Sequence, residues 1–123
     1  MSLPRLRALV VDDDPTMVEF VTRTLARAGF AVETAADGLS ALEMFRKDPY
    51  DAVVIDLRMP KLSGISFLLN LRLKPNSPHR VVMLTSLDDA KVRREALDAG
   101  AVAFLVKPAT SRQILDALLR VTG

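Results

Sequence analysis

Residues 8–17, ALVVDDDPTM, run from four apolar side chains directly into three aspartates and a proline. The apolar run is typical of a β-strand that is buried on both faces of a sheet. The pair Asp14 and Pro15 is typical of a helix start, because aspartate caps free N–H groups and proline suits the first turn. The stretch therefore predicts a βα unit. Because adjacent carboxylates repel one another, it also raises the question of what gathers them at a strand end.

The strand-then-helix pattern of this stretch recurs along the chain. A βα repeat predicts a parallel sheet with helices on both faces. Five such units predict the α/β class, with a flavodoxin-like doubly wound sheet of five parallel strands in the order 2-1-3-4-5 and five helices. In that order, ligands bind at the carboxyl ends of strands one and three, where the winding direction reverses. The predicted strands are residues 7–11, 31–35, 51–56, 80–85 and 102–106.

Polar residues near the predicted helices indicate where these begin. Asp14 is interpreted as the cap of the first helix, and Ser86 as the cap of the fourth. The third helix is expected within residues 65–74, which are rich in apolar side chains. Thr110 with Gln113 three residues later resembles a capping box and predicts the start of the fifth helix.

Composition limits the class of protein. The chain has 123 residues, half of them apolar, and we expect one domain over residues 1–123 in which residues 1–5 are disordered or derive from an expression tag. The chain has no cysteine and one histidine, so a disulfide framework is excluded and a zinc site is disfavoured. The net charge is +2 and the basic residues are scattered, which gives no support for nucleic-acid binding. Without a membrane-length apolar run or a leader, we expect a cytoplasmic protein that does not enter a membrane.

Reactive polar residues follow four of the five predicted strands. Asp12 and Asp13 follow the first, Asp56 the third, Thr85 the fourth and Lys107 the fifth. In the predicted strand order these side chains meet at one edge of the sheet. Clustered carboxylates are hard oxygen ligands that select Mg²⁺, while a hydroxyl and an ammonium group suit phosphoryl oxygens. The pattern predicts a Mg²⁺ site beside a nucleophilic carboxylate.

In this order the motifs resemble those of the response-regulator receiver domain of two-component signalling, over essentially residues 6–121. The motifs are the acidic pair Asp12 and Asp13, DLRMP with Asp56, the following Gly64, TS with Thr85 and KP with Lys107. The resemblance implies that Asp56 accepts a phosphoryl group from the phosphohistidine of a sensor histidine kinase or a histidine phosphotransfer protein. It also implies that Lys107 contacts that phosphoryl group and that the hydroxyl of Thr85 turns towards it.

The resemblance also implies a metal site and a switch. Mg²⁺ would be held by the carboxylates of Asp12, Asp13 and Asp56 and by the backbone carbonyl of Arg58. Phosphorylation would draw Thr85 inward and let Phe104 fill the vacated space, which shifts the surface formed by the fourth helix, fifth strand and fifth helix. That surface is a candidate for homodimer formation. The expected chemistry is limited to Mg²⁺-dependent self-phosphorylation and self-dephosphorylation, so the domain is a signalling switch and not a metabolic enzyme.

Two other functions fit parts of the same pattern. Asp12 and Asp14 after an apolar strand are similar to the first motif of haloacid-dehalogenase-type phosphatases, in which they would be nucleophile and general acid. That family needs an acidic pair after its lysine, which this chain lacks, and the interpretation leaves Asp56 without a role. The other alternative is a receiver-like docking module that works without phosphorylation. His79 is expected in a surface loop, and the sequence does not decide whether the peptide bond after Lys107 is cis.

Overall fold

Five parallel strands form one sheet in the order β2-β1-β3-β4-β5, as the sequence predicted. The computed structural model describes residues 5–119, so the expectation for residues 1–4 lies outside the described part of the chain. Neighbouring strands pair in parallel, which requires the chain to cross back over the sheet between strands. The strands are β1 (Arg7–Val11), β2 (Ala31–Ala35), β3 (Ala52–Ile55), β4 (Arg80–Thr85) and β5 (Ala103–Val106).

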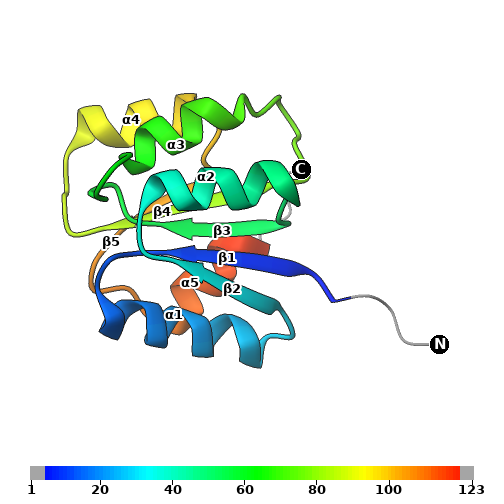
Figure 1. Cartoon of the computed structure of the whole chain (residues 1–123). Helices are drawn as coiled ribbons and strands as arrows, with labels where there is room; N and C mark the ends of the chain where they lie inside the picture. Colours follow the sequence, from blue (N-terminus) through cyan, green and yellow to red (C-terminus); the bar gives the residue numbers. More distant parts are fainter. Residues whose placement is uncertain (1–4, 120–123) are drawn as a thin grey trace.

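Four helices make these crossings and a fifth follows the last strand. Together they cover both faces of the sheet (Figure 1). Two lie on one face, α1 (Pro15–Arg27) and α5 (Ser111–Leu119). Three lie on the other face, α2 (Gly38–Lys47), α3 (Gly64–Leu71) and α4 (Ala90–Asp98). Within residues 5–119, no helix has the length and apolar character needed to cross a membrane. The strands end at the left edge of the sheet in Figure 1, where each chain segment turns into the next helix.

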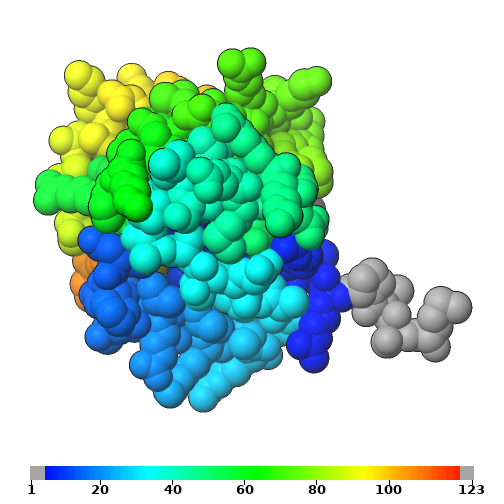
Figure 2. Space-filling model, in the orientation of Figure 1, coloured from blue at the N-terminus to red at the C-terminus, as the bar shows by residue number. Residues whose placement is uncertain are grey.

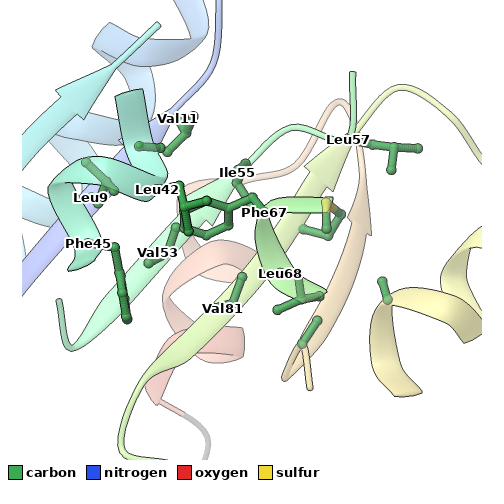
Figure 3. Close-up of a cluster of buried hydrophobic side chains, with 14 of the residues drawn as sticks. Leu9, Val11, Leu42, Phe45, Val53, Ile55, Leu57, Phe67, Leu68 and Val81 are labelled. Atoms are coloured by element: carbon green, nitrogen blue, oxygen red, sulfur yellow. The ribbon is translucent and has the colours of Figure 1, made fainter. Parts of the chain in front are cut away.

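The alternation of side chains along each strand divides the core into two clusters. On the face of α2 and α3, Phe67 and Leu68 are fully buried against the strands, as Figure 3 shows. The opposite face packs Leu25 of α1 and Ile114 of α5 against the sheet. Since both faces are covered, the central strands contain almost no exposed residue, which explains why their sequences are unbroken apolar runs.

Two of the predicted helix starts are confirmed and one is wrong. The side chain of Asp14 accepts a hydrogen bond from the backbone N–H of Thr16 and caps α1. Thr110 and Gln113 form the reciprocal capping box, with distances of 2.8 and 3.1 Å between side-chain oxygen and backbone nitrogen. Ser86 does not cap α4, because the side chain that accepts hydrogen bonds from its first turn belongs to Asp89.

Two further expectations, both for the segments between β3 and β4, hold only in part. The helix expected within residues 65–74 ends at Leu71, because Arg72 adopts a left-handed backbone conformation with a φ of 51°. His79 lies in the loop before β4, as expected, but it is half-buried there. Its Nδ1 lies 2.8 Å from the carbonyl oxygen of Tyr50, so this histidine ties two neighbouring segments together.

A polar cluster joins β1, β2 and the segment before β3, away from the carboxyl ends of the strands. The guanidinium of Arg7 lies 2.6 Å from Glu33 and stacks 4.3 Å above the ring of Tyr50. The hydroxyl of Tyr50 also donates to Glu33, at 2.9 Å. The hydrogen bonds from Tyr50 and then from Arg7 hold the pKa of the Glu33 carboxyl below its ordinary value.

We expect a stability contribution from Glu33 that disappears in acid. A carboxyl with a lowered pKa stabilises the folded chain above its unfolded pKa of about 4.3, and this contribution is lost as the pH falls through the folded pKa. Urea unfolding of the wild type and Glu33→Gln should differ near pH 6 and converge towards pH 3. The exposed Glu43→Gln variant is the control and should follow the wild type at each pH. A difference for Glu33→Gln that grows in acid would contradict the expectation.

Candidate functional site

The strand register brings Asp12 and Asp56 side by side. Val11, the last residue of β1, pairs with Ile55, the last residue of β3, and an aspartate directly follows each of them. The backbone N–H of Asp56 donates to the carbonyl of Val11 at 3.0 Å, so the pairing continues up to the aspartates. Two segments that lie 44 residues apart in sequence thus place their carboxylates at the point where the winding direction of the sheet reverses.

Thr85 and Lys107 reach the same edge from the other half of the sheet. Thr85 pairs with Val106, and the backbone N–H of Lys107 donates to the carbonyl of Thr85 at 2.8 Å. The Lys107–Pro108 peptide bond is cis. Figure 2 shows the outer surface of this edge on its left side, where blue, green, yellow and orange segments from distant parts of the sequence meet.

The ammonium group of Lys107 lies between two carboxylates. Its Nζ is 2.8 Å from Oδ2 of Asp12 and 3.0 Å from Oδ2 of Asp56. The side chain of Lys107 is 17% exposed, that of Asp12 7% and that of Asp56 12%. Burial lowers the pKa of Lys107, but its hydrogen bonds to Asp12 and Asp56 and their negative charges outweigh burial, so the pKa lies above its ordinary value. The lysine is therefore a fixed positive charge shared by both aspartates.

The remaining oxygen atoms of the two aspartates are held by their own loops. Oδ1 of Asp12 accepts from the backbone N–H of Asp14 at 2.9 Å. Oδ1 of Asp56 accepts from the backbone N–H of Arg58 at 3.1 Å. Each carboxylate is thus oriented by a hydrogen bond two residues further along the chain, a turn that aspartate forms readily. This arrangement fixes the carboxylates without using Asp13.

Asp13 differs from its neighbours. Its side chain is exposed and makes no hydrogen bond or ion pair with any residue in the described part of the chain. Across residues 5–119, no three His, Cys, Asp or Glu side chains are grouped closely enough to hold a metal ion. A hollow of about 410 Å³ opens beside Asp12 and Asp13, between α1 and the end of β2. The oxygen-only donors Asp12, Asp13 and Asp56 suit Mg²⁺, and Asp13 is accessible to join the other two.

Gly64 lets α3 begin directly against the backbone of Asp56. A Cβ atom at this position would lie 2.4 Å from the carbonyl oxygen of Asp56 and 3.0 Å from Sδ of Met83. The N–H of Gly64 donates to the carbonyl of Leu57 at 2.9 Å, which closes the turn between β3 and α3. A glycine is required here because the backbones approach too closely for any side chain.

The Gly64→Ala variant should therefore lose stability and distort the strand end. We expect unfolding to be easier by about 2–3 kcal/mol, since the added methyl group can be accommodated only by moving backbone. Chemical denaturation followed by circular dichroism measures this. Leu69→Ala is the control on the same helix, because that side chain is 58% exposed and its loss should cost little. Equal stabilities for both variants would contradict the expected steric role.

Thr85 and Phe104 lie on the same face of the sheet. Thr85 is fully buried and Phe104 is 5% exposed. Phe104 pairs with Met83, and Thr85 pairs with Val106, so side-chain alternation directs all four towards the helices α3 and α4. Oγ1 of Thr85 accepts a hydrogen bond from the backbone N–H of Leu87 at 3.3 Å. The two residues expected to form a switch are thus neighbours within one packed layer.

Asp14 stands apart from the other two aspartates. Its carboxylate is exposed and binds the backbone N–H of Thr16 at 3.0 Å, whereas Asp12 turns towards Lys107. A phosphatase that used Asp12 as nucleophile and Asp14 as general acid would need both at one reacting group. The helix-capping position of Asp14 fits its predicted structural role instead.

Sequence reasoning missed the contact between Arg93 and Phe104. The guanidinium carbon of Arg93 on α4 lies 5.2 Å from the centre of the Phe104 ring, and the same guanidinium lies 3.7 Å from Asp88. The charged residues of α4 gave no signal for this pair, because a scattered charge pattern does not reveal which arginine faces a ring on another element.

Known proteins share both the sequence pattern and this geometry. The family model described as "Response regulator receiver domain" matches residues 8–119. The response regulator MprA of Mycobacterium ulcerans is 41% identical over 120 residues, which cover 95% of this chain and 51% of the relative. MprA of Mycobacterium tuberculosis is 40% identical with similar coverage. The chain spans about half the length of these curated relatives.

Solved structures of the same kind superpose on the fold. The chemotaxis response regulator CheY4 of Vibrio cholerae has a TM-score of 0.84 at 33% identity, with 97% of this chain and 100% of that chain covered. A chain of the CheX-CheY-BeF3-Mg²⁺ complex from Borrelia burgdorferi also has a TM-score of 0.84, at 31% identity, with 93% and 87% covered. The family match, the relatives and the arrangement of polar strand ends agree: the chain belongs to the response regulator receiver domain family and is a receiver domain of two-component signalling.

Proposed function

We propose that this domain accepts a phosphoryl group on Asp56 and changes its surface in response. The observation that supports this proposal most directly is the placement of Lys107, whose ammonium binds Asp12 and Asp56 together at the edge where the winding reverses. A fixed positive charge beside a buried carboxylate stabilises the charge that develops during phosphoryl transfer. The donor is the phosphohistidine of a sensor histidine kinase or a histidine phosphotransfer protein, as the resemblance implies.

The proposed reaction has two steps. A carboxylate oxygen of Asp56 attacks the phosphorus atom of the donor, an O–P bond forms, the N–P bond breaks, and the histidine nitrogen leaves with the bonding pair and takes up a proton. In self-dephosphorylation, the oxygen of water forms a bond to phosphorus and the bond between phosphorus and the Asp56 oxygen breaks. Inorganic phosphate leaves and the free carboxylate is restored. Lys107 would exchange its contact with Asp56 for the phosphoryl oxygens. Small acyl phosphates can replace phosphohistidine as donors.

Asp12, Asp13, Asp56 and the backbone carbonyl of Arg58 are proposed to hold Mg²⁺. When bound, the ion offsets the negative charge of the carboxylates and of the transferred group. The chemistry of this donor set supports the assignment, because it consists of oxygen atoms alone and one carboxylate, that of Asp13, is exposed and unpaired within the described residues. The related CheX-CheY-BeF3-Mg²⁺ complex of Borrelia burgdorferi includes Mg²⁺, which supports the same choice of ion here.

The output of the switch is proposed to pass through Thr85 and Phe104 to the surface formed by α4, β5 and α5. The hydroxyl of Thr85 would leave the N–H of Leu87 for the phosphoryl group, and Phe104 would move into the released space. A local charge change then biases a packed layer that has two arrangements. The same surface is proposed to form a homodimer. We place the domain in the cytoplasm, which suits a chain without cysteine.

Mass spectrometry after treatment with acetyl phosphate and Mg²⁺ tests the proposal. Phosphorylation of Asp56 that disappears when EDTA replaces Mg²⁺ is the expected result. Phosphorylation of Asp12 would instead indicate the phosphatase chemistry. A chain that stays unmodified at donor concentrations that label another receiver domain in parallel would indicate a docking module without phosphoryl transfer.

A further inference from the structure

One basic side chain of α4 bridges three elements around Phe104. The guanidinium of Arg93 lies over the Phe104 ring of β5, with 5.2 Å between its central carbon and the ring centre. It also approaches Asp88, in the loop that follows β4, at 3.7 Å. Thr85 is the last residue of β4, directly before this loop, so the arginine connects the segment that follows the switch hydroxyl with the strand that carries the switch ring.

The ring contact is the stronger of these two interactions. The ion pair joins side chains that are 45% and 74% exposed, and such surface pairs contribute little. Phe104 is 5% exposed, and the guanidinium lies over a ring that belongs to the buried core cluster. A cation over an aromatic face is attracted by the ring quadrupole, and the attraction strengthens as water is excluded.

We propose that Arg93 is a positioning residue that holds Phe104 against α4 and thereby opposes the switch. This inference rests on the proposed function, because it concerns how the response to Asp56 phosphorylation is set. The contact exists together with the Lys107–Asp56 ion pair and the Leu87–Thr85 hydrogen bond. Moving the ring towards Thr85 would withdraw it from the guanidinium.

A contact that is present in one arrangement and lost in the other shifts the balance between them. Arg93 therefore stabilises the arrangement in which Lys107 binds the carboxylate of Asp56. A phosphoryl group or its mimic must overcome this contact to move Phe104. Removing the guanidinium should make that step easier, and the apparent affinity for the mimic should rise by the free energy that the contact supplied.

The next residue of α4 provides a matched control. Arg94 is exposed and makes no ion pair or ring contact with any residue from 5 to 119. Arg93→Ala and Arg94→Ala remove the same charge from adjacent positions of one helix, so the two variants differ in the contacts of Arg93 with Phe104 and, more weakly, with Asp88. Arg93→Lys keeps a cation and should restore part of the effect.

The test is a titration of the folded wild-type and variant chains with beryllofluoride in saturating Mg²⁺, followed by the amide NMR signal of Leu57. We expect the midpoint for Arg93→Ala to fall about two- to fivefold, the range of a partly exposed cation–π contact. Arg94→Ala should match the wild type, and Arg93→Lys should lie between. Unfolding temperatures recorded for each variant separate this shift from a general loss of stability.

A second background keeps the inference separable from the proposed function. In Phe104→Leu the ring face is gone, so Arg93→Ala should no longer change the midpoint. Persistence of the shift in that background, or an unchanged or raised midpoint for Arg93→Ala in the wild-type background, would overturn the role of Arg93. Failure of the wild type itself to bind beryllofluoride would instead overturn the proposed function.

Discussion

Asp56→Asn should abolish phosphorylation by acetyl phosphate, with a loss of at least about 1,000-fold in the rate of labelling. Asparagine keeps the shape of the side chain and can still accept the hydrogen bond from Arg58. It lacks the anionic oxygen that attacks phosphorus, and the other carboxylates at this edge are Asp12, which is paired with Lys107, and Asp13, which is proposed to hold Mg²⁺. Intact-protein mass spectrometry with excess donor and Mg²⁺ measures the loss.

Asp116→Asn is the control for this variant. Asp116 is an exposed carboxylate on α5 that makes no contact with the strand ends, so the variant should label at the wild-type rate. Peptide mapping of the Asp56→Asn variant decides between the candidates. Substantial label on Asp12 or Asp13 in that variant would show that the nucleophile was assigned to the wrong residue.

Lys107→Ala should slow phosphorylation by about 100-fold or more, because it removes the positive charge that would contact the phosphoryl oxygens. It also leaves Asp12 and Asp56 facing each other at a site where their side chains are 7% and 12% exposed. Repulsion between them should strengthen binding of Mg²⁺ while transfer becomes slower. Labelling rates over a range of Mg²⁺ concentrations separate these two effects.

The comparison variant for Lys107 is Lys91→Ala, which removes an exposed lysine of α4. It should leave the labelling rate unchanged. Lys107→Arg should restore little, because a planar guanidinium cannot place a single compact charge between the two oxygen atoms. A Lys107→Ala variant that labels at the wild-type rate in saturating Mg²⁺ would show that the lysine orients carboxylates without acting on the phosphoryl group.

The strands and their order could be predicted because burial on both faces leaves an unmistakable pattern. Four apolar residues before Asp12 and before Asp56 have no alternative to a central strand, and polar residues can follow only where each strand ends. Strand order alone places Asp56 and Lys107 at the same edge of the sheet. Helix ends were less predictable: Asp89 was overlooked as a cap because Ser86, closer to the strand, also carries a side-chain oxygen that can accept a hydrogen bond.

Contacts between distant side chains were beyond the sequence. Whether Lys107 would bind one carboxylate or two depends on where its flexible chain ends, and no periodicity encodes that position. The same holds for Arg93, whose neighbour Arg94 has an identical side chain and makes no ring contact in the described chain. The half-burial of His79 in its loop was not predicted, because a lone histidine between proline and arginine gives no sign that its ring packs against Phe45.

The separate environments of the three consecutive aspartates have a consequence for charged runs in general. Asp12 is paired with Lys107 at the sheet edge, Asp13 is exposed, and Asp14 caps the first turn of a helix. Three residues that are consecutive in the sequence thus have three different environments at the end of the strand. Consecutive aspartates can accordingly have different partners, and the formal charge of the run then overstates the field that a ligand meets.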